Sequence, residues 1–323
     1  MNKKLSSRLA VLQGLLCVMV VFIHSRNTMY SGLADSDKIA IIQYAVNTIC
    51  QVAVPTFFVI SAYLFYWNTD CLESVWIKMK KRLFTLGIPY LIWNTVWTVY
   101  AILLFKLGLG TSDYTDMSVI KIVCDILLSA NSPLWFVLHL LIFTVLSPFI
   151  YAVIQRNVLC IVLIVVSMIV VVCTQMDYYS PTYWIPFYIG GGYTAIHKDV
   201  VLKKTGAGIT RCGLLMLICV MFTFVIEITF YNWYSIWFFR YISTATILYL
   251  WFCSKRTFEI RTLNYSLPIY CLHGRIVSTI KHYTNGMIWF LISPVIAIVL
   301  ISVFCYVFKK FMPKMYNLAF GGR

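Results

Sequence analysis

A histidine near one end of the first long apolar run is the clearest candidate for chemistry in this chain. The run covers 9–25, and on a helix Gln13 and Cys17 fall on the same face as His24, because separations of 11 and 7 residues are close to whole turns. Gln13 would lie roughly 16 Å from His24 along the helix axis. A neutral imidazole can accept a proton near pH 7. The alternative is structural: an interfacial histidine, with the glutamine bonded to a neighbouring helix.

Two further histidines lie in apolar segments. Ser266, Tyr270 and His273 project from one side of a short predicted helix. Ionisable groups at membrane depth are costly unless they are paired or face a wet cavity, so a second such histidine favours a functional interpretation of both. Trp135 and His139 also share a helix face, and there a stacked structural histidine and a functional one are equally compatible with the pattern.

Basic residues supply the candidate anion-binding groups. Arg82 ends a basic run that starts at Lys78 and directly precedes an apolar segment. The lysines of this run are typical topogenic charges, whereas a guanidinium can hold a phosphate in a fork geometry. Glu227 and Arg240 flank one loop at equal distances, so in a helical hairpin they would reach the same depth. A structural ion pair is favoured there over a substrate contact.

The elements that must position these residues are membrane spans. The chain is 61% hydrophobic and 11% charged, and no polar stretch is long enough for a separate soluble domain. We therefore expect a single integral-membrane domain over 1–323, all-α, with about ten transmembrane helices. Pro55 divides the second run, and 113–131 is expected to be interfacial or re-entrant. The runs are 9–25, 39–67, 84–106, 134–154, 157–175, 181–196, 211–231, 235–253, 265–280 and 286–308.

The charge pattern predicts orientation. With both termini cytoplasmic, most of the 26 basic residues fall in inner segments, as the positive-inside rule requires. The net charge of +15 is then explained by topology and by contact with the lipid bilayer, so no nucleic-acid partner is expected. The 11 cysteines are scattered without a C-x-x-C pair, which predicts neither disulfides nor a metal site.

Six short motifs occur in a fixed order along the chain. They are Gly14-x(9)-His24-Ser25, Val54-Pro-x-Phe-Phe-x-Ile-Ser-x-Tyr-Leu-Phe65, Lys81-Arg-Leu-x(4)-Ile-Pro-Tyr90, Leu134-Trp-Phe with Leu146-Ser-Pro148, Phe187-x(2)-Gly190 and Ser266-Leu-x-Ile-Tyr-x-Leu-His273. Each motif alone is weak, but their order and spacing across nearly the whole chain are specific. Together they resemble the acyltransferase 3 family of multispanning bacterial membrane acyltransferases, in particular the branch that O-acetylates surface polysaccharides.

The resemblance implies a catalytic mechanism and a substrate pair. The donor would be acyl-CoA, in particular acetyl-CoA, reached from the cytoplasm, and the acceptor a glycan outside. His24 would act as general base or transient acyl carrier, and His273 or Tyr270 would polarise the carbonyl or orient the base. Arg82, with other inner basic residues, would bind the CoA phosphates.

The chain departs from the family pattern at three positions. Gln13 stands where the family commonly has arginine, Ala62 where glycine is usual, and His139 where a small residue is common. The change at Gln13 removes a positive charge that would help to hold the donor. Arg8 lies one and a half turns earlier on another face, so it is an imperfect substitute.

The sequence therefore predicts a multi-pass enzyme of the bacterial cytoplasmic (inner) membrane, an O-acetyltransferase acting on a surface polysaccharide or a lipid-linked glycan. Two alternatives remain open. Broken spans and buried ionisable groups also suit a transporter or flippase of a small solute or lipid-linked sugar. An inactive acyltransferase-like membrane protein would explain Gln13.

Overall fold

The computed structural model describes residues 3–29, 38–109, 118–128, 133–198, 209–253, 265–284 and 286–321. Within these ranges the regular structure is helical and no strand occurs, which confirms the predicted all-α class. The first half of the chain forms α1 (Lys3–Ser25), α2 (Lys38–Cys50), α3 (Ala53–Tyr66), α4 (Leu72–Lys106), α5 (Val119–Leu127), α6 (Trp135–Val145) and α7 (Ser147–Ile154). The second half forms α8 (Asn157–Thr174), α9 (Pro181–Ile196), α11 (Ile209–Phe230), α12 (Trp233–Cys253), α13 (Ser266–Tyr283), α14 (Met287–Phe311) and α15 (Pro313–Phe320).

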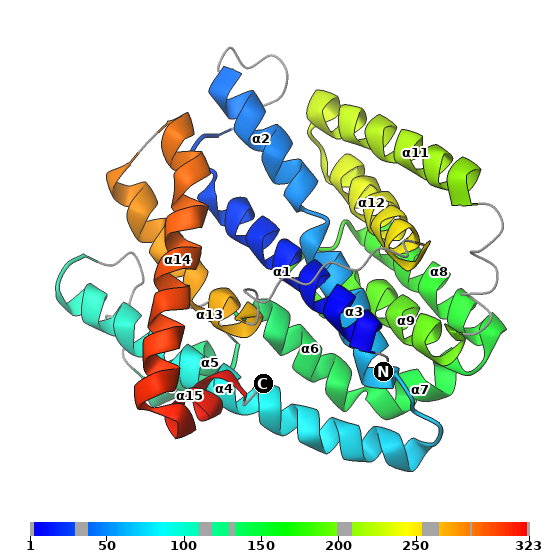
Figure 1. The fold of residues 1–323 in the computed structure, drawn as a ribbon, viewed down its shortest axis with the longest axis horizontal. Coiled ribbons are helices and arrows are strands. Elements are labelled where there is room, and N and C mark those ends of the chain that lie inside the picture. Colours follow the sequence, from blue (N-terminus) through cyan, green and yellow to red (C-terminus); the bar gives the residue numbers. More distant parts are fainter. Residues whose placement is uncertain are drawn as a thin grey trace.

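Helix α1 occupies the middle of the bundle (Figure 1). It packs against α13, α14, α3 and α2. Its buried positions include Leu9, Leu16, Val20 and Val21, so the apolar run is enclosed by other helices on several sides. This central place explains why polar side chains on α1 can face protein or a cavity rather than lipid.

Proline divides the second apolar run as predicted. Helix α2 ends at Cys50 and α3 begins at Ala53, so Pro55 lies in the first turn of α3. There its missing N–H costs nothing, but in a continuous helix its ring would clash with the carbonyl of Gln51. The break therefore falls just before the proline.

Six helical segments are long and apolar enough to cross a membrane, and the pair α6–α7, bent by 67°, makes a seventh if it is one span. A multispanning helical protein is thus confirmed, while the count of ten and the position of the termini stay predictions. Helices are present for the other three predicted spans, but α9 has only 16 residues. The segments that meet the length and apolarity requirement are Ser6–Ser25, Lys38–Tyr66, Leu72–Lys106, Asn157–Thr174, Arg211–Phe230 and Met287–Phe311.

Helix α4 differs from the predicted third span. It starts at Leu72, twelve residues before the predicted boundary, because no helix breaker interrupts the basic run. Lys80 and Lys81 are exposed on this extension, whereas Arg82 is half-buried. The arginine therefore belongs to a rigid helix and not to a loop, which gives its side chain a fixed direction.

The described part of the predicted interfacial segment forms α5, a short helix with no buried side chain. The hydroxyl of Ser118 caps it by accepting a hydrogen bond from the backbone N–H of Lys121 at 3.2 Å. Its nine residues are too few to cross a bilayer, so an interfacial position fits its length.

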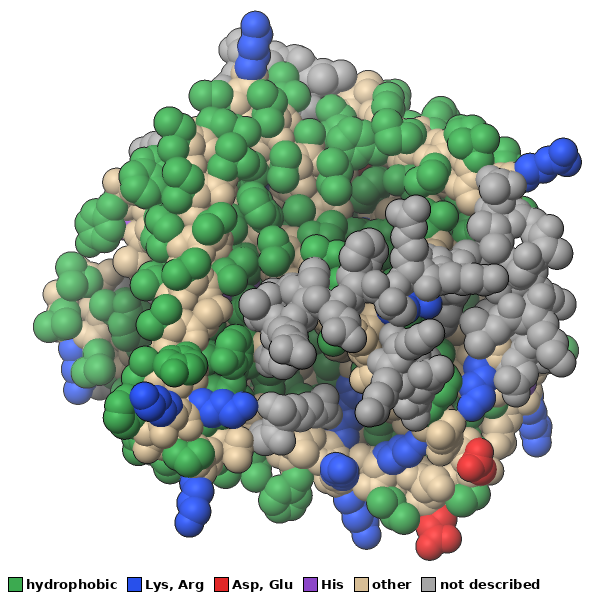
Figure 2. Space-filling model, viewed as in Figure 1, with side chains coloured by type: hydrophobic (Ala, Val, Ile, Leu, Met, Phe, Trp, Pro, Cys, Tyr) green, Lys and Arg blue, Asp and Glu red, His purple; other side chains and the backbone are tan. Residues whose placement is uncertain are grey.

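The surface of the bundle carries two kinds of region (Figure 2). Hydrophobic side chains cover most of the described part of the visible face, while Lys and Arg gather along the lower edge over α4, α15 and the end of α14. The positive-inside rule would place that edge at the cytoplasm. Exposed apolar side chains are frequent on α8, α11 and α14, for example Val158, Ile161, Ile169, Leu214, Ile218, Met221, Val295, Val299 and Val303.

The predicted ion pair between Glu227 and Arg240 does not form. The carboxylate of Glu227 instead accepts hydrogen bonds from the hydroxyls of Tyr44 and Ser235. Arg240 donates to the hydroxyl of Tyr183 at 2.8 Å and to Oε1 of Gln51 at 2.7 Å. The hairpin of α11 and α12 is present, but each of the two side chains is hydrogen-bonded to other partners.

The closest approach of the α3 backbone to α9 lies at Gly191. A Cβ added at Gly191 would lie 2.2 Å from the carbonyl oxygen of Val59 and 2.8 Å from its Cα. A Cβ added at the neighbouring Gly190 would have nothing within 4 Å. Small residues at such contacts let helix backbones approach each other in membranes.

We predict that Gly191→Ala lowers the thermal stability of the detergent-purified protein. The added methyl group would meet the backbone of Val59, which cannot rotate away as a side chain could. The free energy of unfolding should therefore fall by about 1–3 kcal/mol. Gly190→Ala is the matched control and should leave the melting temperature near that of the wild type. Thermal unfolding followed by size-exclusion chromatography measures both. Equal melting temperatures for the two variants would contradict the close approach of α3 and α9.

Candidate functional site

The two predicted histidines meet at the end of α1. The ring centroids of His24 and His273 are 4.9 Å apart, and the rings meet edge to face at 65°. His24 is exposed, whereas His273 is fully buried. The sequence named both residues but did not predict their contact. We refer to them as the histidine pair.

The hydrogen bonds of His273 fix its protonation pattern. Its Nδ1 lies 2.8 Å from the carbonyl oxygen of Ile269. A carbonyl oxygen only accepts, so Nδ1 carries the hydrogen and the neutral ring presents a lone pair at Nε2. This buried Nε2 has no hydrogen-bond partner among the described residues. Buried polar atoms without a partner are uncommon in native proteins, and a catalytic role is one explanation for them.

The last turn of α1 is anchored from outside the helix. The carbonyl oxygen of Ile23 accepts a hydrogen bond from Nδ2 of Asn47 at 3.0 Å, and that of His24 accepts one from Nζ of Lys281 at 3.2 Å. The hydroxyl of Ser25 donates to the carbonyl of Phe22 at 2.8 Å. The last carbonyls of a helix have no partner within it, so these bonds fix the backbone of His24.

Polar side chains on one face of α2 and in the turn after it extend this anchor across the bundle. Gln51 donates to Oδ1 of Asn47 at 3.0 Å, and Gln51 in turn accepts from Arg240. Gln43 lies one turn earlier on the same face and holds the chain after α1 through Asn27, 2.7 Å away. Sequence reasoning missed this row, although its spacing of four residues within an apolar run was visible.

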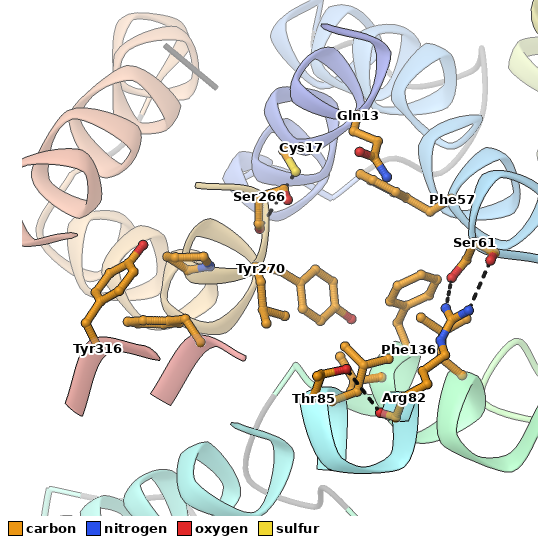
Figure 3. A pocket seen from close by; sticks show the side chains of 16 residues that line it. Gln13, Cys17, Phe57, Ser61, Arg82, Thr85, Phe136, Ser266, Tyr270 and Tyr316 are labelled. Carbon is orange, nitrogen blue, oxygen red and sulfur yellow. Dashed lines mark hydrogen bonds between the residues drawn. The ribbon is translucent and has the colours of Figure 1, made fainter. Parts of the chain in front are cut away.

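A cavity of about 150 Å³ opens between α1, α3, α4, α6, α13 and α15. In Figure 3, Gln13, Phe57, Tyr270 and Arg82 surround its open centre from four different helices. The structure therefore brings together three residues that the sequence placed in the site, Gln13, Arg82 and Tyr270. We refer to this space as the main cavity.

Arg82 projects toward the main cavity from α4. Its guanidinium donates to the carbonyl oxygen of Ser61 at 3.1 Å and also bonds to the hydroxyl of that residue. It lies over the ring of Phe65, with Cζ 5.4 Å from the centroid. The buried Nε has no hydrogen-bond partner among the described residues, and the hydrogen bonds of the guanidinium go to Ser61 rather than to a carboxylate. Arg82 thus brings an uncompensated positive charge to the cavity wall.

The two other predicted donor-binding residues differ in position. Gln13 lines the main cavity, and its amide makes no hydrogen bond with the described part of the chain. Arg8 is not among the lining residues, because its guanidinium bonds to the carbonyl oxygen of Trp251 and lies 4.7 Å from the centre of that ring. The structure therefore does not bring Arg8 to the cavity with Arg82.

Tyr270 separates the main cavity from the histidine pair. Its hydroxyl donates to the carbonyl oxygen of Pro133 at 2.7 Å, and its ring lies 5.8 Å from that of His273. The hydroxyl proton is thus already engaged in this structure. Tyr270 acts here as a wall of the site.

A second, smaller cavity of about 10 Å³ lies beside His273. Cys17, Phe57 and Tyr270 line both this small cavity and the main one. The predicted stripe of Gln13, Cys17 and His24 therefore runs from the main cavity, along the small cavity, to the histidine pair.

His139 belongs to the aromatic core. It is 2% exposed, with its ring 5.4 Å from Trp135 and 6.4 Å from Phe58. It lines neither of the two cavities. The structural interpretation of this residue therefore fits its surroundings.

Helix α15 supplies cavity residues that sequence reasoning missed. Tyr316 and Phe320 line the main cavity. The helix is held by Trp93, whose Nε1 donates to the carbonyl oxygen of Ala319 at 2.9 Å and whose ring stacks on Phe320 at 5.3 Å. The signal in the sequence was the spacing of Tyr316 and Phe320 by about one helical turn, which places both rings on one face of a helix.

Among the described residues, no group of three or more His, Cys, Asp or Glu is placed to hold a metal ion. The polar groups at the site are instead imidazole, guanidinium, amide, hydroxyl and thiol. Together they can move a proton at one end and bind an anion at the other.

Comparison with known proteins gives one match. A family model described as an acyltransferase domain matches residues 7–309. No curated protein and no solved structure matches the chain. The match includes all six predicted site residues, and it ends before α15. Since it covers most of a helical chain with several membrane-spanning segments, this protein belongs to the acyltransferase 3 family and is a membrane acyltransferase.

Proposed function

We propose that this acyltransferase moves an acetyl group from acetyl-CoA to a hydroxyl of a surface polysaccharide or a lipid-linked glycan, across the bacterial cytoplasmic membrane. The observation that carries the proposal is the arrangement along α1. An unpaired arginine borders the main cavity at one end, and an exposed histidine in contact with a buried one stands at the other. The anionic donor and the hydroxyl acceptor would thus approach from opposite sides.

The reaction needs a base because a sugar hydroxyl is a weak nucleophile when protonated. His24 would remove the hydroxyl proton as the oxygen attacks the thioester carbonyl. The new C–O ester bond forms, the C–S bond breaks, and the imidazolium returns its proton to the departing CoA thiolate. General-base catalysis of this kind typically contributes about 10²–10⁴-fold in rate.

His273 is better placed than Tyr270 to orient His24. Its ring touches that of His24, and its own orientation is fixed by the bond to Ile269. The hydroxyl of Tyr270, in contrast, is engaged with Pro133. A fixed neutral ring beside the base restricts its rotamers, which preserves the geometry needed for proton transfer.

The donor would be held at the basic edge of the bundle. CoA carries several phosphates, and a guanidinium binds phosphate through two parallel hydrogen bonds. Ser61 holds Arg82 ready at the cavity, while Gln13 offers an amide where many family members would have a second positive charge. The donor site of this chain would then depend on Arg82 more strongly than a site with two arginines.

The first prediction from the proposed function concerns the base. His24→Ala should abolish acetyl transfer by the purified protein while abundance and melting temperature stay near normal, because the side chain is exposed and makes no hydrogen bond with the described residues. The activity of the variant is measured as transfer of label from radiolabelled acetyl-CoA to extracted glycan. The control is His282→Ala, an exposed histidine on α13 outside the site, which should keep wild-type activity. Normal transfer by His24→Ala would rule out this residue as base or carrier. Protein that never consumes acyl-CoA but transports a solute would favour the transporter alternative.

The second prediction concerns the anchor of α1. Asn47→Asp keeps the volume but removes the donor to the carbonyl of Ile23. We expect kcat to fall about tenfold with an unchanged KM for acyl-CoA, together with a stability cost of about 1–3 kcal/mol. Asn94→Asp is the matched control, since Asn94 is also buried and donates to a backbone carbonyl, that of Tyr90, at 2.9 Å. It should cost stability without lowering kcat. Equal kcat values for the two variants would mean that Asn47 does not position His24.

The third prediction concerns the donor. Arg82→Ala should weaken acetyl-CoA binding by about 1.5–3 kcal/mol, roughly 10–150-fold, and Arg82→Lys should recover only part because lysine lacks the fork. Gln13→Arg should tighten binding, because its side chain already lines the cavity. Calorimetry on purified protein measures the affinity of all three variants for acetyl-CoA. The control is Arg211→Ala, because Arg211 is exposed. Unchanged affinity in both Arg82→Ala and Gln13→Arg would show that the donor binds elsewhere.

A further inference from the structure

We infer that Phe57 on α3 is the acyl-length filter of this enzyme: with Cys17 and Tyr270 it closes the passage from the main cavity to His273, so that an acetyl group passes and longer chains do not. The inference rests on the proposed function, since it assumes that the main cavity holds the acyl donor. It adds a specificity-determining residue that the family match does not assign.

The first support is the set of side chains that line both cavities. Only three side chains border both cavities within the described part of the chain, and they come from three helices: Cys17 from α1, Phe57 from α3 and Tyr270 from α13. A group that moves from the main cavity toward His273 has to pass between them.

The second support is the difference in size. The main cavity measures about 150 Å³ and the small cavity about 10 Å³. A volume of 10 Å³ corresponds to about one water molecule. A small movement of the walls would admit a methyl group, whereas a chain of several methylenes would have to displace whole side chains in a packed interior.

The third support is that two of the three walls are tethered. The hydroxyl of Tyr270 is bound to Pro133 at 2.7 Å, and the thiol of Cys17, 4% exposed, lies 3.8 Å from the carbonyl oxygen of Ser266. Phe57 carries no polar atom that could tie its ring, which contacts Phe136 at a centroid distance of 6.0 Å. The size and rotamer of Phe57 therefore set the width of the passage.

Phe136 provides a matched comparison. It is the same residue type and lines the main cavity, but it does not line the small one. Truncation of Phe136 should enlarge the donor site and change the rates with all donors. Truncation of Phe57 should in addition open the passage.

The test uses the purified full-length protein with acetyl-, butyryl- and hexanoyl-CoA as separate donors. Wild type should transfer acetyl much faster than butyryl. Phe57→Ala should raise the butyryl-to-acetyl rate ratio by about tenfold or more, which is the typical effect of pocket shape on one to two methylenes. Phe57→Leu, a milder change for the case that the alanine variant does not fold, should give an intermediate ratio.

Cys17→Leu places a larger side chain in the same passage. It should therefore lower the transfer rate of acetyl in addition to that of the longer acyl groups. Phe136→Ala should leave the butyryl-to-acetyl ratio at its wild-type value. A wild-type protein that uses butyryl-CoA as readily as acetyl-CoA would overturn the filter, as would an unchanged ratio in Phe57→Leu and Phe57→Ala while acetyl transfer persists. Absence of transfer from every acyl-CoA by the wild type would instead overturn the proposed function.

Discussion

The contact between the last turn of α1 and helix α13 is the interaction on which the rest of the site depends. It joins His24 to His273, and it is maintained because the carbonyls at the end of α1 are bonded to Asn47 and Lys281. Lipid cannot satisfy backbone groups, so these partners must come from neighbouring helices. A rotation of α1 that broke the contact would also leave carbonyls without partners and would move Cys17 and Gln13 out of the cavities. The packing of one helix end thus positions both the histidine pair and the α1 side chains that line the two cavities.

The charged residues inside the bundle obey the same constraint in different ways. Glu227 is surrounded by hydroxyl donors, and Arg240 binds an amide and a phenol. Each is stabilised locally by hydrogen bonds, and neither borders the main cavity or the small cavity. Arg82 is also hydrogen-bonded, through Ser61, but it faces open space. A positive charge beside a cavity, without a carboxylate to neutralise it, attracts an anion more strongly than one enclosed among neutral partners. This difference separates the structural arginine from the one proposed to bind the donor.

In the proposed function, the two cavities would link the choice of acyl group to its transfer across the membrane. The main cavity, which Arg82 borders, measures about 150 Å³, while the cavity beside His273 measures about 10 Å³. A transferase that works across a membrane must let the acyl group pass without opening a path for ions or water. A passage closed by Phe57, Cys17 and Tyr270, and wide enough for an acetyl group alone, would meet both requirements. Short-chain specificity and the permeability barrier would then have a common cause.

The sequence by itself determined the helical membrane fold and most of the candidate site. Apolar runs exclude a soluble fold, because only helices or barrels satisfy backbone groups in lipid, and the period of 3.6 residues placed Gln13, Cys17 and His24 on one face. Tertiary structure decided which of these faces meet. It brought His24 onto His273, directed Arg82 to Ser61, left Arg8 on Trp251 and separated Glu227 from Arg240. It also brought α15 to the main cavity and placed Phe57 in the lining of both cavities. Such contacts join residues far apart in the chain, and they depend on how helices rotate and tilt against one another, which periodicity within one helix does not specify.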